Sequence, residues 1–86
     1  MSNRELLTEM GYEDSIVFEN PDYDSAIVGV TMDGSVVYDF DLMVDDLMIE
    51  GMASWEAADF ISYNTIRALP YMPEPRPIIM VRLEDR

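Results

Sequence analysis

Residues 26–38 read AIVGVTMDGSVVY, and this stretch sets the architecture of the chain. Residues 26–31 and 35–38 are rich in the β-branched and aromatic residues that favour strands. Asp33-Gly34 separates the two runs, and this dipeptide is a strong hairpin signal because glycine accepts the positive φ that a tight turn requires. The segment therefore predicts an antiparallel β-hairpin, around which the rest of the chain is interpreted.

Two shorter elements precede the hairpin. Residues 2–10 predict a short helix, in which Ser2 and Glu5 form a capping box and Gly11 follows the last turn. Residues 15–19, SIVFE, predict a short edge strand or an extended lead-in that ends at residues 20–21, Asn-Pro.

Two helices are expected after the hairpin. The first is capped by Asp39 or Asp41 and ends at Gly51, and its apolar residues have the spacing of one helix face: Phe40, Met43, Val44, Leu47 and Met48. The second opens at Ser54 and is stopped by Pro70, which cannot continue a helix.

A proline-rich connector, residues 71–77, leads to a last strand over residues 77–82. The continuous apolar run of this strand predicts burial on both faces or a central place in the sheet. The element order α-(β)-β-β-α-α-β predicts an α+β fold. We expect a small, mainly antiparallel sheet of three to four strands, with the helices packed on one face, in a single domain over residues 1–86.

The charge of the chain is strongly one-sided. Eighteen acidic residues against five basic ones give a net charge of −13, and the basic residues are all arginines. No basic residue occurs between Glu5 and Ile66, so the two signs are segregated along the chain. A body of one sign repels nucleic acid and anionic lipid. Solubility alone is a sufficient interpretation of the total charge, but it does not require this segregation.

The composition excludes most ordinary catalysts. The chain has no histidine, cysteine or lysine, so a serine nucleophile has no activating base and zinc has none of its usual ligands. We therefore expect a protein that is not an enzyme and has no cofactor and no metal. A calcium-binding module is a third-ranked alternative, because Asp22-x-Asp24 resembles the start of a calcium loop, but Ala26-Ile27 stand where the loop requires a ligand and a glycine.

The helix after the hairpin carries a row of acids that local stability does not favour. Asp41 with Asp45, and Asp46 with Glu50, are like-charge pairs four residues apart, and each costs about 0.2–0.5 kcal/mol. Such a row is expected of a surface that meets a basic partner, although a plain solvated face is an alternative. The predicted partner-binding residues are Asp22, Tyr23, Asp24, Asp39, Asp41, Asp45, Asp46 and Glu50.

Two segments carry a resemblance to known proteins. Residues 38–44, YDFDLMV, and residues 63–71, YNTIRALPY, are similar to a group of small uncharacterised acidic proteins of gut Firmicutes and their phages or mobile elements. By size, charge and context, that group resembles anti-CRISPR and anti-restriction inhibitors. The resemblance implies a protein whose carboxylates occupy a DNA-reading surface of a nuclease complex.

The favoured prediction is a phage-type inhibitor that imitates nucleic-acid charge and blocks a basic surface of a nucleic-acid-binding complex such as a Cas effector. It binds neither nucleic acid nor membrane, and it acts in the cytoplasm of a bacterial host, since no signal peptide or apolar run of membrane-spanning length is present. The alternative is a small regulator or interaction module, monomeric or homodimeric, whose acidity serves only solubility and whose contact residues include Leu42 and Ile49.

Overall fold

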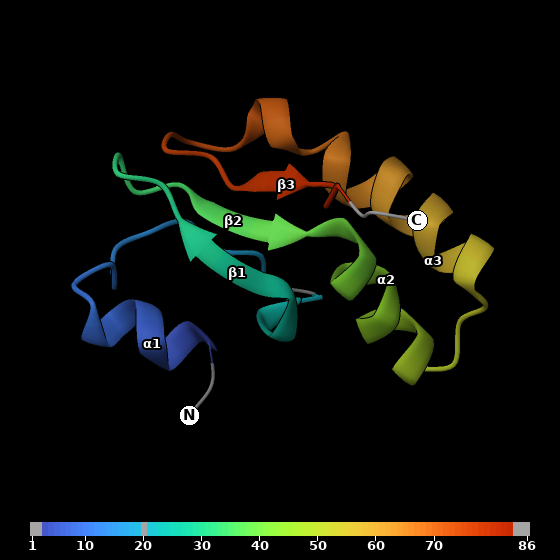
Figure 1. Ribbon diagram of the computed structural model, residues 1–86. Coiled ribbons are helices and arrows are strands. Elements are labelled where there is room, and N and C mark those ends of the chain that lie inside the picture. Colours follow the sequence, from blue (N-terminus) through green and yellow to red (C-terminus); the bar gives the residue numbers. More distant parts are fainter. Residues whose placement is uncertain (1–2, 20, 84–86) are drawn as a thin grey trace.

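Figure 1 shows a computed structural model of the chain, which describes residues 3–19 and 21–83. Its helices and strands are α1 (Asn3–Glu9), β1 (Ile27–Val30), β2 (Val36–Asp39), α2 (Phe40–Ile49), α3 (Ser54–Phe60) and β3 (Ile78–Met80). Two 3-10 turns, η1 (Asp24–Ala26) and η3 (Leu69–Tyr71), and a π-helical segment, η2 (Ile61–Ile66), complete the chain. The predicted α+β class with a small sheet is confirmed, as is the approximate order of the elements.

The sheet has three strands in the order β1-β2-β3. The predicted hairpin is confirmed: β1 and β2 are antiparallel, and the turn is closed by a 2.8 Å hydrogen bond from Thr31 N to Ser35 O, with Gly34 at a φ of 97°. β3 lies parallel to β2, so the sheet is mixed. A parallel partner requires a long crossover connection, and α2 and α3 provide it.

The prediction of a central, doubly buried last strand is wrong. β3 is an edge strand beside β2, and Ile78 is 42% exposed. Ile79 pairs with Tyr38 and packs against the core, whereas Ile78 lies on the opposite face of the sheet. The apolar residues of β3 therefore form a strand with one face on the core and one face that is partly exposed.

The hydrophobic core covers one face of the sheet. Val36 and Tyr38 are fully buried there, and residues 15–19 cross it as an extended lead-in rather than a strand, with Phe18 N donating to Tyr38 Oη at 3.0 Å. The helical segments add their own buried residues to the same cluster: Leu7, Met43, Leu47, Ala57 and Ile61. In Figure 1, α1 flanks β1 while α2 and α3 lie together beyond the end of β2.

The helix boundaries follow the predicted signals where the structure describes them. The proposed cap residue Ser2 lies outside the described residues, but Gly11 follows α1 at a φ of 93° and Tyr12 N donates to Leu7 O at 2.9 Å. Asp39 is the N-cap of α2 and accepts from Leu42 N at 3.2 Å. α3 begins at Ser54, where Glu56 Oε1 accepts from Ala53 N.

Candidate functional site

The loop that leads into β1 is held in an unusual conformation. Tyr23 has a φ of 52°, in the left-handed region that side chains other than glycine seldom adopt. Its side chain is only 1% exposed, its ring meets Phe18 edge-on at 5.9 Å, and its hydroxyl lies 3.1 Å from Thr65 Oγ1 in η2. Burial raises the pKa of Tyr23. The buried ring therefore fixes the loop in place and leaves almost none of Tyr23 exposed for contact with a partner.

A groove of about 690 Å³ lies between this loop, the C-terminal half of α2 and α3. Its wall includes the carboxylates of Asp22, Asp46 and Glu50, which come from two separate segments. Apolar side chains line the same space: Leu47, Ile49, Met52 and Phe60. We call this feature the acidic groove.

Four carboxylates line the acidic groove. Glu19 pairs with Arg4, and the other three, Asp22, Asp46 and Glu50, are open to an incoming cation. Asp22 Oδ1 accepts from Asp24 N at 3.0 Å, and Asp46 accepts from the hydroxyl of Ser25, so both side chains are oriented by neutral donors. Within residues 3–19 and 21–83, no arginine forms an ion pair with Asp22, Asp46 or Glu50. Their charges are therefore uncompensated by this part of the chain.

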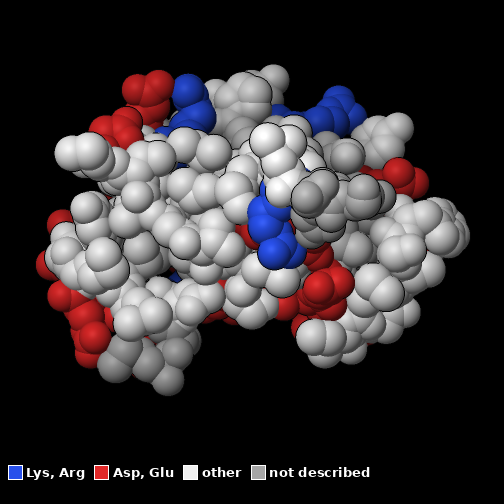
Figure 2. Space-filling model, viewed as in Figure 1, with Lys and Arg blue, Asp and Glu red and all other residues white. Residues whose placement is uncertain are grey.

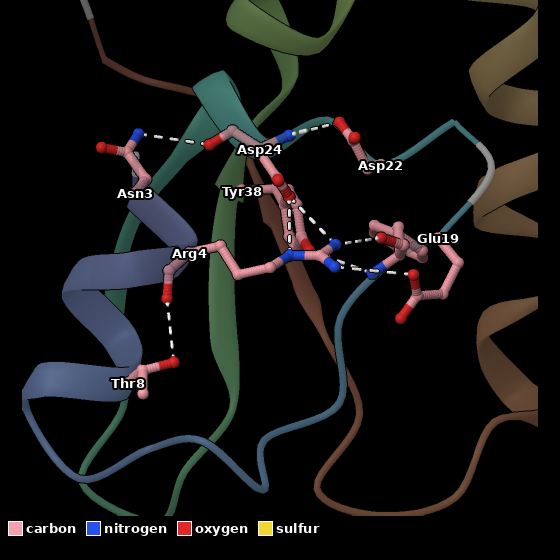
Figure 3. A network of polar contacts seen from close by, with 8 residues as sticks. Asn3, Arg4, Thr8, Glu19, Asp22, Asp24 and Tyr38 are labelled. Carbon is pink, nitrogen blue, oxygen red and sulfur yellow. Dashed lines mark hydrogen bonds and ion pairs between the residues drawn. The ribbon is translucent and has the colours of Figure 1, made fainter. Parts of the chain in front are cut away.

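Asp24 has a different role from the one predicted. Arg4 in α1 binds it through Nε at 3.1 Å and Nη2 at 3.0 Å, and the same guanidinium donates to Phe18 O and pairs with Glu19 at 3.5 Å (Figure 3). Burial raises the pKa of the Asp24 carboxyl, against the lowering effect of Arg4. Asp24 thus joins α1 to the core, and Arg4 already occupies the position of an incoming arginine.

Asp39 also departs from its predicted role. Its side chain is fully buried, with Oδ1 capping α2 and Oδ2 in an ion pair with Arg82, which follows β3. Apart from that ion pair, Oδ2 has no hydrogen-bond partner among the described residues. The prediction that Asp39 presents its charge to a partner is wrong, because the cap position at the end of β2 turns the carboxylate inward.

The remaining acids of the predicted row lie on a separate surface. Asp41 and Asp45 are exposed on α2 but do not line the acidic groove. On the face shown in Figure 2, acidic side chains form separate groups with basic side chains between them. The structure therefore brings Asp22, Asp46 and Glu50 to one groove, together with the buried Tyr23. It places the other predicted acids in three different environments: Asp24 with Arg4, Asp39 with Arg82, and Asp41 and Asp45 on an exposed face of α2.

Sequence reasoning missed parts of the acidic groove. Glu19 lines it from the lead-in segment, and Met52 and Phe60 line it from the residues around α3. No local pattern marks these residues, because they meet only through the fold. Ile49, predicted as a dimer contact, is 84% exposed at the groove, whereas Leu42, predicted with it, packs against the core.

Among residues 3–19 and 21–83, no group of three acidic side chains is arranged to hold a metal ion. In the same part of the chain, no helix combines the length and the apolar character needed to cross a bilayer.

Comparison with family models, with curated proteins and with solved structures finds no match to this chain.

Proposed function

We propose that this protein is a non-catalytic inhibitor that binds a basic, nucleic-acid-reading surface of a CRISPR–Cas effector or another nuclease complex. The observation that supports it most strongly is the acidic groove, which Asp22, Asp46 and Glu50 line together with apolar side chains. These three carboxylates form no ion pair with a described arginine. The partner is a protein surface with projecting arginines.

The chemistry of the groove favours arginine as the residue that enters it. A guanidinium is more weakly hydrated than an ammonium and makes bidentate, charge-assisted hydrogen bonds with carboxylates. Its aliphatic stem gains by burial against apolar side chains, which Ile49, Met52 and Phe60 supply. Nucleic-acid-binding proteins meet phosphates with arginine and lysine, so a protein that occupies those side chains displaces the nucleic acid.

The test is a competition experiment with purified nuclease complexes. We expect the protein to displace labelled target DNA from at least one member of a panel of Cas effector and restriction complexes, with an affinity that falls as salt rises from about 50 to about 300 mM. A groove variant, Asp22→Asn with Asp46→Asn and Glu50→Gln, keeps the neutral hydrogen bonds of the loop. It should lose about 100-fold in affinity, which corresponds to about 3 kcal/mol.

The matched control removes the same charge elsewhere. Glu9→Gln with Glu13→Gln and Asp14→Asn alters exposed acids that do not line the acidic groove, and it should change the affinity less than about threefold. If the two variants lose affinity equally, net charge alone explains the binding, and the acidic groove has no specific part in it. Failure to displace DNA from any complex in the panel would contradict the proposed function.

A homodimeric interaction module is the second candidate, and the open face of the sheet favours it. Val28 and Ile78 are exposed on strands β1 and β3, and Val81, just after β3, is exposed as well. Sedimentation equilibrium of the wild type and of Ile78→Ser tests this role. A stable dimer that Ile78→Ser dissociates would support it, and a monomer at protein concentrations on the order of 100 μM would exclude it.

A further inference from the structure

A second groove lies on the outer side of the helix that begins at Ser54. Its volume is about 320 Å³, and its lining includes Trp55, Phe60 and Tyr63 together with the acids Glu56 and Asp59. Trp55 and Tyr63 are 68% and 66% exposed, which is unusual for large aromatic side chains of a small domain. We call this feature the aromatic groove.

The backbone beneath the aromatic groove is held in a specific geometry. α3 continues into the π-helical segment η2, and such segments occur frequently at functional sites. Asn64 Nδ2 donates to Phe60 O at 3.2 Å, which supplies a partner to a carbonyl within the widened turn. Thr65, from the same turn, meets the buried hydroxyl of Tyr23. Tyr63 therefore projects from a turn that is fixed by hydrogen bonds on both sides of it.

The charges around the aromatic groove favour a cation. Asp59 is exposed one helical turn after Trp55, and no described arginine forms an ion pair with it. Arg67 places its guanidinium carbon 5.8 Å from the centroid of the Tyr63 ring and so lies over that ring, which leaves the exposed Trp55 for an incoming guanidinium. Tryptophan is the aromatic residue that attracts cations most strongly.

The two grooves are neighbours. Met52 and Phe60 line both the acidic groove and the aromatic groove, so a partner segment that enters one passes directly across these side chains to the other. A partner with two spaced arginines can therefore engage both.

We propose that the aromatic groove is a second arginine subsite for the partner protein, in which a guanidinium stacks on Trp55 and donates to the carboxylate of Asp59. The assignment rests on the proposed function for the nature of the partner, since that partner is an arginine-bearing protein surface. The subsite should prefer arginine to lysine, which charge alone does not explain. A planar guanidinium both stacks and hydrogen-bonds, whereas a lysine ammonium is a compact, strongly hydrated charge.

Trp55 reports on this subsite directly, because it is the only tryptophan in the chain. The probes are a nona-arginine and a nona-lysine peptide, each labelled and titrated against the full chain. We expect nona-arginine to change the Trp55 emission to saturation and to bind at least about fivefold more tightly than nona-lysine, a difference of about 1 kcal/mol. Equal binding of the two peptides, or an unchanged Trp55 emission, would overturn the proposal.

Two variants test the contacts of Trp55 and Asp59, with binding measured by fluorescence polarisation of the labelled peptides. Trp55→Leu keeps an apolar side chain and should weaken nona-arginine about fivefold with little effect on nona-lysine, and Asp59→Asn should weaken nona-arginine as well. Tyr71→Leu is the control, because Tyr71 is 90% exposed but lies outside both grooves. An effect of Tyr71→Leu equal to that of Trp55→Leu would overturn the subsite.

The acidic-groove variant, Asp22→Asn with Asp46→Asn and Glu50→Gln, separates this proposal from the proposed function. If the groove variant abolishes DNA displacement while Trp55→Leu leaves both displacement and nona-arginine binding unchanged, the function stands and the second subsite is excluded. If Trp55→Leu weakens nona-arginine while no nuclease complex is displaced by the wild type, the subsite stands and the proposed function fails.

Discussion

Tyr23 and Tyr38 show how single buried side chains position the acidic groove. The left-handed backbone of Tyr23 costs about 1–2 kcal/mol, which burial of its ring and the contact with Thr65 offset. That backbone places Asp22 at the groove. The hydroxyl of the buried Tyr38 accepts a hydrogen bond from Phe18 N, and the centroid of its ring lies 4.8 Å from that of Phe18.

The buried hydroxyl of Tyr38 predicts a loss of stability in alkali. Burial raises the pKa of Tyr38 from its ordinary value of 10 to about 12. Between these values the unfolded chain releases this proton and the folded chain retains it, so the free energy of unfolding falls as pH rises. The fall approaches about 1.4 kcal/mol per pH unit. Urea titrations at intervals of about one pH unit from about pH 9 to about pH 12 measure it.

Tyr38→Phe isolates that contribution. The variant is less stable than the wild type at about pH 8, because Phe18 N loses its acceptor. The difference in unfolding free energy between the two proteins should shrink as pH rises from 10 toward about 12, since the variant has no proton at this site. A constant difference over this range would contradict a raised pKa for Tyr38.

Among the elements, α2 carries acids on two separate surfaces, although they form one row in the sequence. Asp41 and Asp45 are exposed and do not line the acidic groove, whereas Asp46, which follows Asp45, and Glu50, the residue after the helix, line it. The like-charge pair Asp41 and Asp45 therefore contributes repulsion to the helix without a described contact in return.

Asp45→Lys should stabilise the protein. The change replaces a repulsive pair with Asp41 by an attractive one, and it should raise the free energy of unfolding by about 0.4–1 kcal/mol at low salt. Because Asp45 does not line the acidic groove, DNA displacement should be retained. Urea unfolding at about 20 mM and about 500 mM NaCl checks the effect, which screening should diminish.

Glu50→Lys is the comparison for Asp45→Lys. It also replaces a like-charge pair, that of Asp46 and Glu50, but it places a cation in the acidic groove and should abolish displacement. Equal displacement by the two variants would contradict the division of α2 into two surfaces.

Across the molecule as a whole, the ion pair between Asp39 and Arg82 joins distant parts of the chain. Asp39 lies at the junction of β2 and α2, and Arg82 follows the edge strand β3. The carboxylate is fully buried while the Arg82 side chain is 48% exposed, so the pair covers a charge that would otherwise be buried without a cation.

Removal of Arg82 should therefore destabilise the fold. Arg82→Gln should lower the free energy of unfolding by about 1–3 kcal/mol, less than for a fully buried pair because water reaches the guanidinium. In the double variant with Asp39→Asn, the further loss due to Arg82→Gln should be small. The amide oxygen that Asp39→Asn introduces can still accept from Leu42 N, so the helix cap is kept.

Arg76→Gln is the matched control. Arg76 pairs with Glu74 at 3.0 Å and donates to Met72 O at 3.0 Å and Pro70 O at 3.4 Å. All these contacts are exposed, so Arg76→Gln should cost less than about 1 kcal/mol. The coupling energy between Asp39 and Arg82 comes from a double-mutant cycle. Chemical unfolding is measured for the wild type, for Asp39→Asn, for Arg82→Gln and for the variant that carries both changes. An effect of Arg82→Gln no larger than that of Arg76→Gln would show that the ion pair contributes nothing.

The hairpin and the start of α2 follow from the sequence alone. The hairpin around Asp33-Gly34 and the start of α2 at Asp39 result from turn chemistry and from the capping of backbone donors, which depend on near neighbours only. The segregation of charge and the absence of histidine, cysteine and lysine are likewise properties of the chain alone.

Contacts between distant segments determine which acids share a surface. Burial depends on such contacts, and no local pattern shows that Asp39 meets Arg82 or that Asp24 meets Arg4. The π turn at Ile61–Ile66, the edge position of β3 and the aromatic groove depend on them as well. The acidic row of the sequence is thus reduced to Asp22, Asp46 and Glu50 at one groove, because those are the carboxylates that the fold brings together there without an ion pair to a described arginine.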